Sequence, residues 1–176
     1  MPLRRHSTLE VNSVILYNMA TNAMNLDLIF RLSSLTVFPF WLLMIFVPRW
    51  RGTQKLLKLP WVVAGAALLY VTLVSPHLRE ILPVLLRPKL ATVAALLGTA
   101  HGATIAWTHF LAFDLFVGRW IYLDSRRRTI PAALTSPLLA LTFMLGPLGL
   151  LLYLGLTSLI WPGASDEVDQ GRATLS

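Results

Sequence analysis

The sequence predicts an all-α integral membrane protein, a four-helix bundle with an extra interfacial or re-entrant segment between helices 2 and 3. Apolar residues make up 56% of the 176-residue chain and charged residues 13%, against about 25% charged in an average soluble domain. A soluble domain of this length has too much surface to carry so few charges. The mean hydropathy of +0.66 agrees with a membrane protein.

Each predicted span is an apolar run of about the 20 residues that a helix needs to cross the hydrocarbon core. The four runs cover residues 26–47, 60–76, 104–123 and 137–160. The fourth is expected to begin at Pro137, with Ser136 as its N-cap. Pro147 lies inside this run and predicts a kink. Three glycines of the same run would let a neighbouring helix approach closely; they are Gly146, Gly149 and Gly155.

The remaining sequence divides the chain into three parts. They are an N-terminal surface segment (1–25), the four-span membrane domain (26–160) and a polar C-terminal tail (161–176). Between helices 2 and 3, residues 81–102 are apolar, but Pro83 and Pro88 interrupt them and Arg87 and Lys89 add charge. We expect this stretch to lie in the interface or to re-enter the membrane, packed on the bundle. A fifth span is the alternative.

The basic residues predict contact with membrane lipid and no binding of nucleic acid, although the net charge is +7. They sit in short stretches between apolar runs, as membrane-flanking charges do. Seven lie on one side of the predicted bundle: Arg49, Arg51, Lys55 and Lys58 between spans 1 and 2, and Arg126, Arg127 and Arg128 between spans 3 and 4. This bias favours a cytoplasmic location for these loops and places both termini on the other side.

Neither a metal nor a cofactor is predicted. The chain has no cysteine, which excludes disulfides, thiol catalysis and Cys-ligated metals. The four histidines show no i,i+4 pair and no adjacent Glu, the spacing typical of a metal site; they are His6, His77, His101 and His109. No Ser-His-Asp order or glycine-rich phosphate loop is visible.

Asp114 is the most informative residue, because it lies at the centre of the third span. A carboxylate there costs roughly 2.5–3.5 kcal/mol unless it is paired or protonated, so it either has a function or fixes helix packing through an ion pair. Arg31 of the first span can reach Asp114, and Asp27 precedes Arg31 by one helical turn. We expect a buried cluster of these three residues, with Arg119 as a competing partner.

An aromatic stripe runs along the third span. Three aromatic residues follow His109 on the same helix face, at steps of 4, 7 and 11: Phe113, Phe116 and Trp120. The stripe is either a lipid-facing or packing surface or a wall for a flat, apolar ligand. Trp107 shares the face of Asp114, about 140° around the helix from His109. The candidate ligand-binding residues are Trp107, Phe113, Phe116, Trp120 and, in the first span, Trp41.

Three segments carry a family resemblance. The most specific is WTHFLAFDLFVGRWIYLD at 107–124, supported by IFRLSSLTVFPFWLLM at 29–44 with PRW at 48–50, and by GPLG at 146–149. Over roughly residues 26–153 the chain resembles the abscisic-acid-deficient-four-like family of integral membrane proteins.

The resemblance implies a small four-helix membrane protein related to the formation of neoxanthin, for which plant members of the family are required. That step isomerises an epoxide of violaxanthin to an allene. The resemblance also implies that the chain acts on or binds a carotenoid or another isoprenoid in the bilayer. Without a recognisable transit peptide, the chain resembles a bacterial member, a multi-pass protein of the inner membrane.

Two functional hypotheses follow. In a cofactor-independent isomerase, Asp114 and His109 would be the catalytic acid and base. Their separation around the helix counts against this unless the substrate wraps the helix or two chains contribute. The alternative is a non-catalytic pigment- or lipid-binding scaffold, with further copies of the chain or other membrane subunits as partners.

Overall fold

The computed structural model describes the backbone of residues 4–160 and the side chains of residues 25–160. The helices are α1 (Arg4–Phe46), α2 (Arg51–Lys58), α3 (Trp61–Val74), α4 (Leu78–Leu86), α5 (Leu90–Leu97), α6 (Ala100–Arg127), α7 (Ala132–Met144) and α8 (Gly146–Ile160), and the 3-10 turn η1 (Ser75–His77) joins α3 to α4. No strand occurs over this range, so the all-α prediction is confirmed. The predicted tail (161–176) lies outside the described residues. Within the predicted N-terminal segment, residues 4–24 continue α1 without a break.

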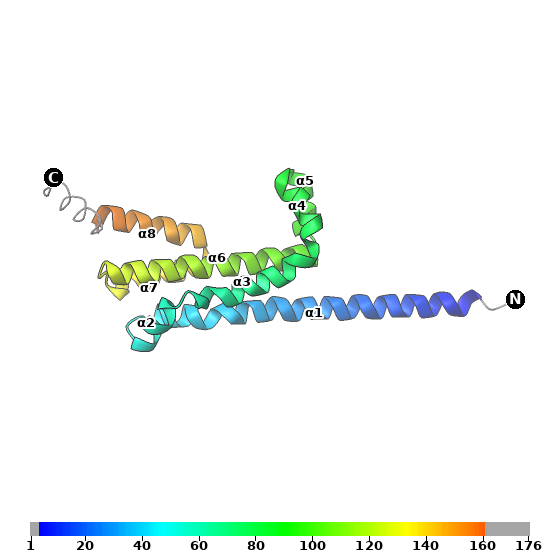
Figure 1. Ribbon diagram of the computed structural model, residues 1–176, viewed down its shortest axis with the longest axis horizontal. Helices are drawn as coiled ribbons and strands as arrows, with labels where there is room; N and C mark the ends of the chain where they lie inside the picture. The colour runs from blue at the N-terminus through cyan, green and yellow to red at the C-terminus, as the bar shows by residue number, and fades with distance from the viewer. Residues whose placement is uncertain (1–3, 161–176) are drawn as a thin grey trace.

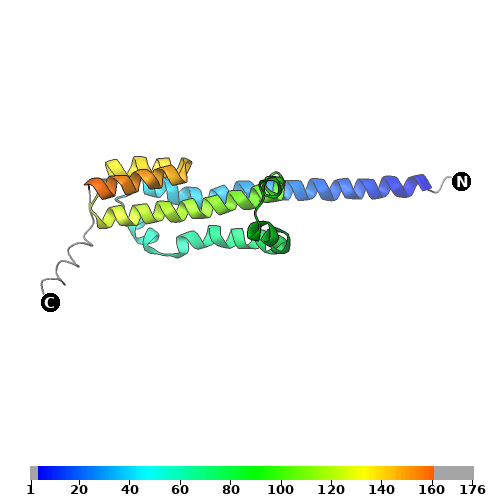
Figure 2. The same cartoon turned by 90° about the horizontal axis from the view of Figure 1, so that it is seen from above.

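The body of the molecule is built on the helices α1, α3 and α6. α1 and α6 lie side by side and run in the same direction, and α3 packs against both and runs the opposite way (Figures 1 and 2). α7 covers α1 and α6 at one end, and α8 lies along α7. At the other end, α4 and α5 project to one side (Figure 1). The helices that contain the first and third predicted spans therefore run parallel to each other.

Two segments are long and apolar enough to cross a membrane: Asn25–Phe46 of α1, and Trp61–Leu86, which combines α3, η1 and α4. α6 passes the same test only together with α5, from which it is bent by 93°. The described residues therefore hold two candidate spans, or three with the bent pair, where the sequence predicted four. The first part of the stretch 81–102 extends the second candidate span.

The described side chains are distributed as in a membrane protein, with many large apolar residues on the outside and with serines and threonines among the apolar residues buried between the helices. Leucines and aromatic residues dominate the exposed surface of the spans. The buried polar side chains are serines and threonines: Ser33, Thr53, Thr104, Thr108, Ser125, Thr135, Thr142 and Thr157. Each donates its hydroxyl to a backbone carbonyl. Helices can thus approach closely without leaving a polar group unsatisfied away from water.

The prediction of a single fourth span over 137–160 is wrong. The chain leaves the helix at Leu145 (φ −140°, ψ 63°), and α8 returns alongside α7 (Figures 1 and 2). α7 has 13 residues and α8 has 15, so they are about 20 and 22 Å long, shorter than the hydrocarbon core of about 30 Å. Pro147 is the second residue of α8, where its missing N–H is tolerated, and Pro137 lies inside α7.

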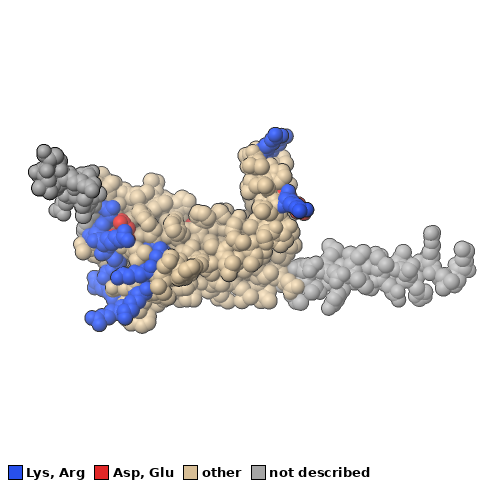
Figure 3. Space-filling view, in the orientation of Figure 1, with Lys and Arg blue, Asp and Glu red and all other residues tan. Residues whose placement is uncertain are grey.

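This hairpin also corrects the predicted topology. The C-terminal end of α8 lies at the same end of the body as α2 and the α6–α7 loop (Figure 1). Lys and Arg side chains gather at this end (Figure 3), which we call the basic end. The sequence had placed the end of the fourth apolar run on the side opposite the basic loops, because it treated residues 137–160 as one span.

Gly149 holds the two arms of the hairpin in backbone contact. A Cβ added at Gly149 would lie 2.6 Å from the Cα of Thr142 on α7, whereas a Cβ at Gly155 meets nothing within 4 Å. We expect Gly149→Ala to destabilise the protein by about 1–3 kcal/mol through overpacking. Gly155→Ala should be neutral or stabilising, because alanine is the better helix former. Melting temperatures in mild detergent test the contrast, and equal values for the two variants would contradict it.

Candidate functional site

The aromatic stripe of α6 lies at the surface of the protein. Phe113, Phe116 and Trp120 are all exposed. Phe116 and Trp120 line an apolar hollow of about 390 Å³ between α6 and α8, which is completed by Val117, Leu150 and Leu154. The face expected from the helical period is therefore accessible, and its C-terminal half is concave.

His109 lies at the N-terminal start of this stripe and packs against α3. Its ring is 5.3 Å from the ring of Tyr70 on α3 and 4.7 Å from the ring of Phe113, measured between centroids. The imidazole is thus packed among aromatic rings and is partly buried.

Asp114 faces a different helix. Its carboxylate lies against Gly146 at the start of α8, and a Cβ on that glycine would collide with it. Among the side chains of residues 25–160, Asp114 takes part in no ion pair. Because His109 packs on α3 and Asp114 on α8, the structure does not bring the proposed acid and base together.

The predicted ion-pair residues are placed differently from what was expected. Arg31 Nε lies 3.0 Å from Asp27 Oδ2, but the two side chains are 74% and 62% exposed, so the expectation of a buried cluster that includes Asp114 is wrong. The i,i+4 spacing satisfies Arg31 locally on α1. Arg119 donates from Nε to the carbonyl of Leu57 at 2.7 Å and from Nη2 to that of Lys58 at 3.1 Å, where it caps the C-terminal carbonyls of α2.

Two of the three tryptophans assigned to ligand binding, Trp107 and Trp41, have structural contacts. Trp107 stacks on Phe30 with centroids 5.3 Å apart, and its Nε1 donates to Ser34 Oγ at 3.1 Å, which ties α6 to α1. Trp41 is 1% exposed and packs against Gly118 and Phe143. Trp41 therefore belongs to the core and lines neither of the hollows described in this section.

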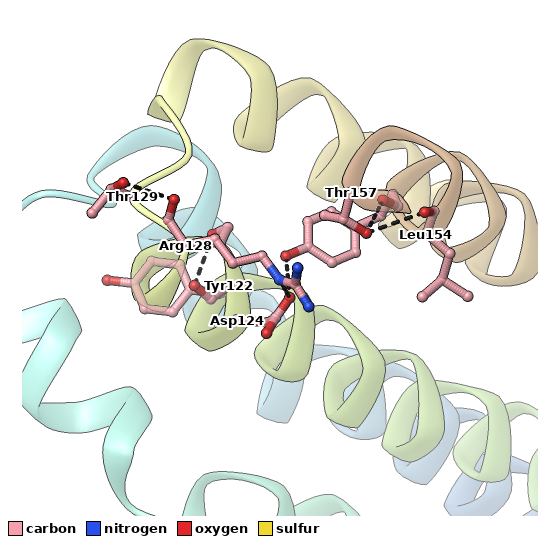
Figure 4. Close-up of polar contacts among 8 residues, drawn as sticks. Tyr122, Asp124, Arg128, Thr129, Leu154 and Thr157 are labelled. Carbon is pink, nitrogen blue, oxygen red and sulfur yellow. Dashed lines mark hydrogen bonds and ion pairs between the residues drawn. The ribbon is translucent and has the colours of Figure 1, made fainter. Parts of the chain in front are cut away.

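A polar cluster at the basic end was missed in the sequence. Asp124 Oδ2 accepts hydrogen bonds from Tyr153 OH and from Arg128 Nε, both at 2.7 Å (Figure 4). The Tyr153 side chain is buried, comes from α8 and contacts the Trp120 ring edge-on at 5.7 Å. The i,i+4 spacing of Asp124 and Arg128 was a visible signal. The role of Tyr153 was not, because it depends on the hairpin.

A second, open hollow of about 700 Å³ lies beside this cluster, between α2 and the last turns of α6. Four of its lining side chains are basic: Lys58, Arg119, Arg126 and Arg127. It also shares Phe116 and Trp120 with the apolar hollow. The two hollows are therefore neighbours, one cationic and one apolar.

A family model described as ABA DEFICIENT 4-like matches residues 28–153, well over half of the chain. The chain belongs to the ABA DEFICIENT 4-like family. The protein ABA DEFICIENT 4, chloroplastic, of Arabidopsis thaliana is 26% identical to it over 108 residues, which are 58% of this chain and 49% of that protein. The chain thus spans about half the length of this relative. No solved structure matches it. Of the residues named in this section, Asp27 and Leu154 lie outside the range matched to the ABA DEFICIENT 4-like family.

Proposed function

We propose that this ABA DEFICIENT 4-like protein is a multi-pass membrane protein that binds a carotenoid or a related isoprenoid along the aromatic face of α6. The observation that carries the proposal is the apolar hollow lined by Phe116 and Trp120. Exposed rings on a concave apolar surface suit a flat, unsaturated chain, because such surfaces bind through apolar contact and ring stacking. The hollow would hold one end of the ligand, and the rest would lie in lipid.

The proposed orientation places the basic end on the cytoplasmic side, because Lys and Arg are enriched in cytoplasmic loops. Asn25–Phe46, Trp61–Leu86 and, together with α5, α6 would then cross the bilayer. The α7–α8 hairpin would enter from the cytoplasmic side and return to it.

Replacement of both Phe116 and Trp120 by alanine is expected to lower the bound isoprenoid roughly tenfold, since each ring contributes about 0.5–1.5 kcal/mol of aromatic contact. The measurement is the absorption spectrum and mass spectrum of the protein purified in mild detergent. The matched control replaces Phe46 and Trp61, two exposed aromatics outside α6, and should retain the ligand. Absence of any isoprenoid from the wild-type protein, or equal loss in both double variants, would refute the proposal.

A second candidate function is a non-catalytic pigment- or lipid-binding scaffold within a larger membrane complex. It is favoured by the separation of Asp114, against α8, from His109, against α3. Opening an epoxide needs an acid at oxygen and a base at carbon within reach of one substrate, and these two groups face different helices.

Asp114→Asn distinguishes an isomerase from a scaffold. Asparagine has nearly the same size against Gly146 but cannot deliver the same proton. If Asp114 is the acid, the variant should keep its fold and ligand and lose conversion of a xanthophyll epoxide, followed by chromatography of the products. Loss of co-purifying subunits or of thermal stability, with no conversion by the wild-type protein, would support the scaffold instead.

A further inference from the structure

The hollow at the basic end is strongly cationic. Lys58, Arg119, Arg126 and Arg127 line it, and Asp124 is the acidic residue among its lining side chains. The Asp124 carboxylate already accepts hydrogen bonds from Arg128 and Tyr153. The negative charge of Asp124 is therefore already paired with Arg128, which is not one of the four basic lining residues. The hollow keeps a net positive charge, which favours an anionic ligand.

Arg119 is positioned in this hollow before any ligand arrives. Two of its hydrogen bonds go to the last carbonyls of α2, out of the five N–H donors of a guanidinium. The other three have no partner among the described residues. A guanidinium fixed in this way suits a phosphate, because its planar fork matches two phosphate oxygens and little side-chain freedom is lost on binding.

The cationic hollow continues into an apolar one. Phe116 and Trp120 line both, and Leu150 and Leu154 of α8 line the apolar side. An anion with no apolar part would leave the second hollow without a ligand, and a neutral polyene would leave the cations without one. The arrangement matches a molecule with an anionic head and an apolar chain.

We propose that the two hollows form one binding site for a phosphate-bearing lipid, with the phosphate among Lys58, Arg119, Arg126 and Arg127 and the chain over Phe116 and Trp120. This inference rests on the same apolar hollow as the proposed function and goes beyond it by adding a site for an anionic group. At the end of the body where Lys and Arg gather (Figure 3), a phosphate would lie at headgroup depth and its chain would point into the hydrocarbon. A phospholipid and a phosphorylated isoprenoid share this chemistry.

The test measures binding to the full chain in a neutral detergent by native mass spectrometry. The probes are dioleoyl phosphatidic acid, farnesyl phosphate, dioleoylglycerol and inorganic phosphate. We expect phosphatidic acid or farnesyl phosphate to bind at least roughly tenfold tighter than dioleoylglycerol, as charge-assisted hydrogen bonds to a phosphate predict. The tighter of the two identifies the source of the phosphate. If neither exceeds dioleoylglycerol, or if inorganic phosphate binds as tightly as both, the proposal is overturned.

Charge-matched variants localise the site. Arg126→Gln with Arg127→Gln should weaken binding of the phosphorylated lipid roughly tenfold or more. Arg51→Gln with Lys55→Gln removes the same charge at the same end but outside the hollow, and should weaken it less than about threefold, because separated surface charges are screened. If both double variants lose affinity for the phosphorylated lipid equally, the effect comes from the general surface charge, and the proposed site is overturned.

Two further readouts keep this proposal separate from that of isoprenoid binding. Trp120→Ala should weaken binding of the phosphorylated lipid and leave any binding of inorganic phosphate unchanged, because Trp120 contacts the chain. Arg126→Gln with Arg127→Gln should leave the content of a neutral carotenoid unchanged. Since both arginines are exposed, the melting temperature should also be retained. A protein without any carotenoid can still be tested for the phosphate site.

Discussion

Asp124→Ala is expected to loosen α8 from α6 and to lower the free energy of unfolding by about 3 kcal/mol or more. The substitution removes the acceptor of the buried Tyr153 hydroxyl and one partner of Arg128 together. Asp124 and Arg128 are 18% and 29% exposed, so water replaces the lost contacts poorly. Thermal unfolding in mild detergent measures the loss. Asp124→Asn should cost less, because its amide oxygen can still accept from Tyr153.

The chain contains a matched control for this variant. Asp27 and Arg31 form an i,i+4 pair of the same residue types, but on an exposed surface of α1. Asp27→Ala should therefore cost less than about 1 kcal/mol. Tyr153→Phe and the double variant with Asp124→Ala complete a thermodynamic cycle, in which the effects should not add because the two residues share a hydrogen bond. Similar losses for Asp124→Ala and Asp27→Ala would mean that α8 is not held by this cluster.

Trp41→Ala is expected to cost about 3–5 kcal/mol, as large-to-small substitutions of buried aromatics do. The Trp41 ring fills the space that the missing side chain of Gly118 leaves on α6, and it also contacts Phe143 on α7 at 5.2 Å. Three helices therefore lose packing together. Within a membrane the loss is mainly one of van der Waals contact, since lipid is as apolar as the core.

Trp61→Ala provides the comparison, because Trp61 is 77% exposed and its removal leaves no cavity. The melting temperature of the Trp61→Ala variant should stay close to that of the wild-type protein. The same pair of variants decides what Trp41 does. If Trp41 formed the wall of a ligand site, Trp41→Ala would keep its melting temperature and lose ligand. We expect instead that Trp41→Ala lowers the melting temperature, because Trp41 is part of the core.

The sequence predicted the features that depend on composition and on periodicity along one helix. Helical class and the positions of the first three apolar runs follow from long apolar stretches with few charged residues. The shared, exposed face of Phe113, Phe116 and Trp120 follows from the helical period. The same period also places His109 and Asp114 on different faces, which the structure bears out through their separate neighbours, Tyr70 and Gly146.

The features that were missed depend on residues distant in sequence. Hydropathy counts the 24 residues of 137–160 as one span, because it contains no information on chain direction. The break at Leu145 is stabilised by contacts across the turn, including that of Gly149 with Thr142. The burial of Trp41 depends on a glycine in α6, and the hydrogen bond of Tyr153 to Asp124 exists because α8 folds back.

The return of α8 to the basic end has a consequence for biogenesis. A chain that crossed the bilayer at 137–160 would require the insertion machinery to export everything that follows. A hairpin of two short helices can enter as one unit from the side on which it is made, since only Leu145 lies between its two helices. Polar sequence after Ile160 would then never pass through the hydrocarbon layer, and the energetic cost of transferring its charges would not arise.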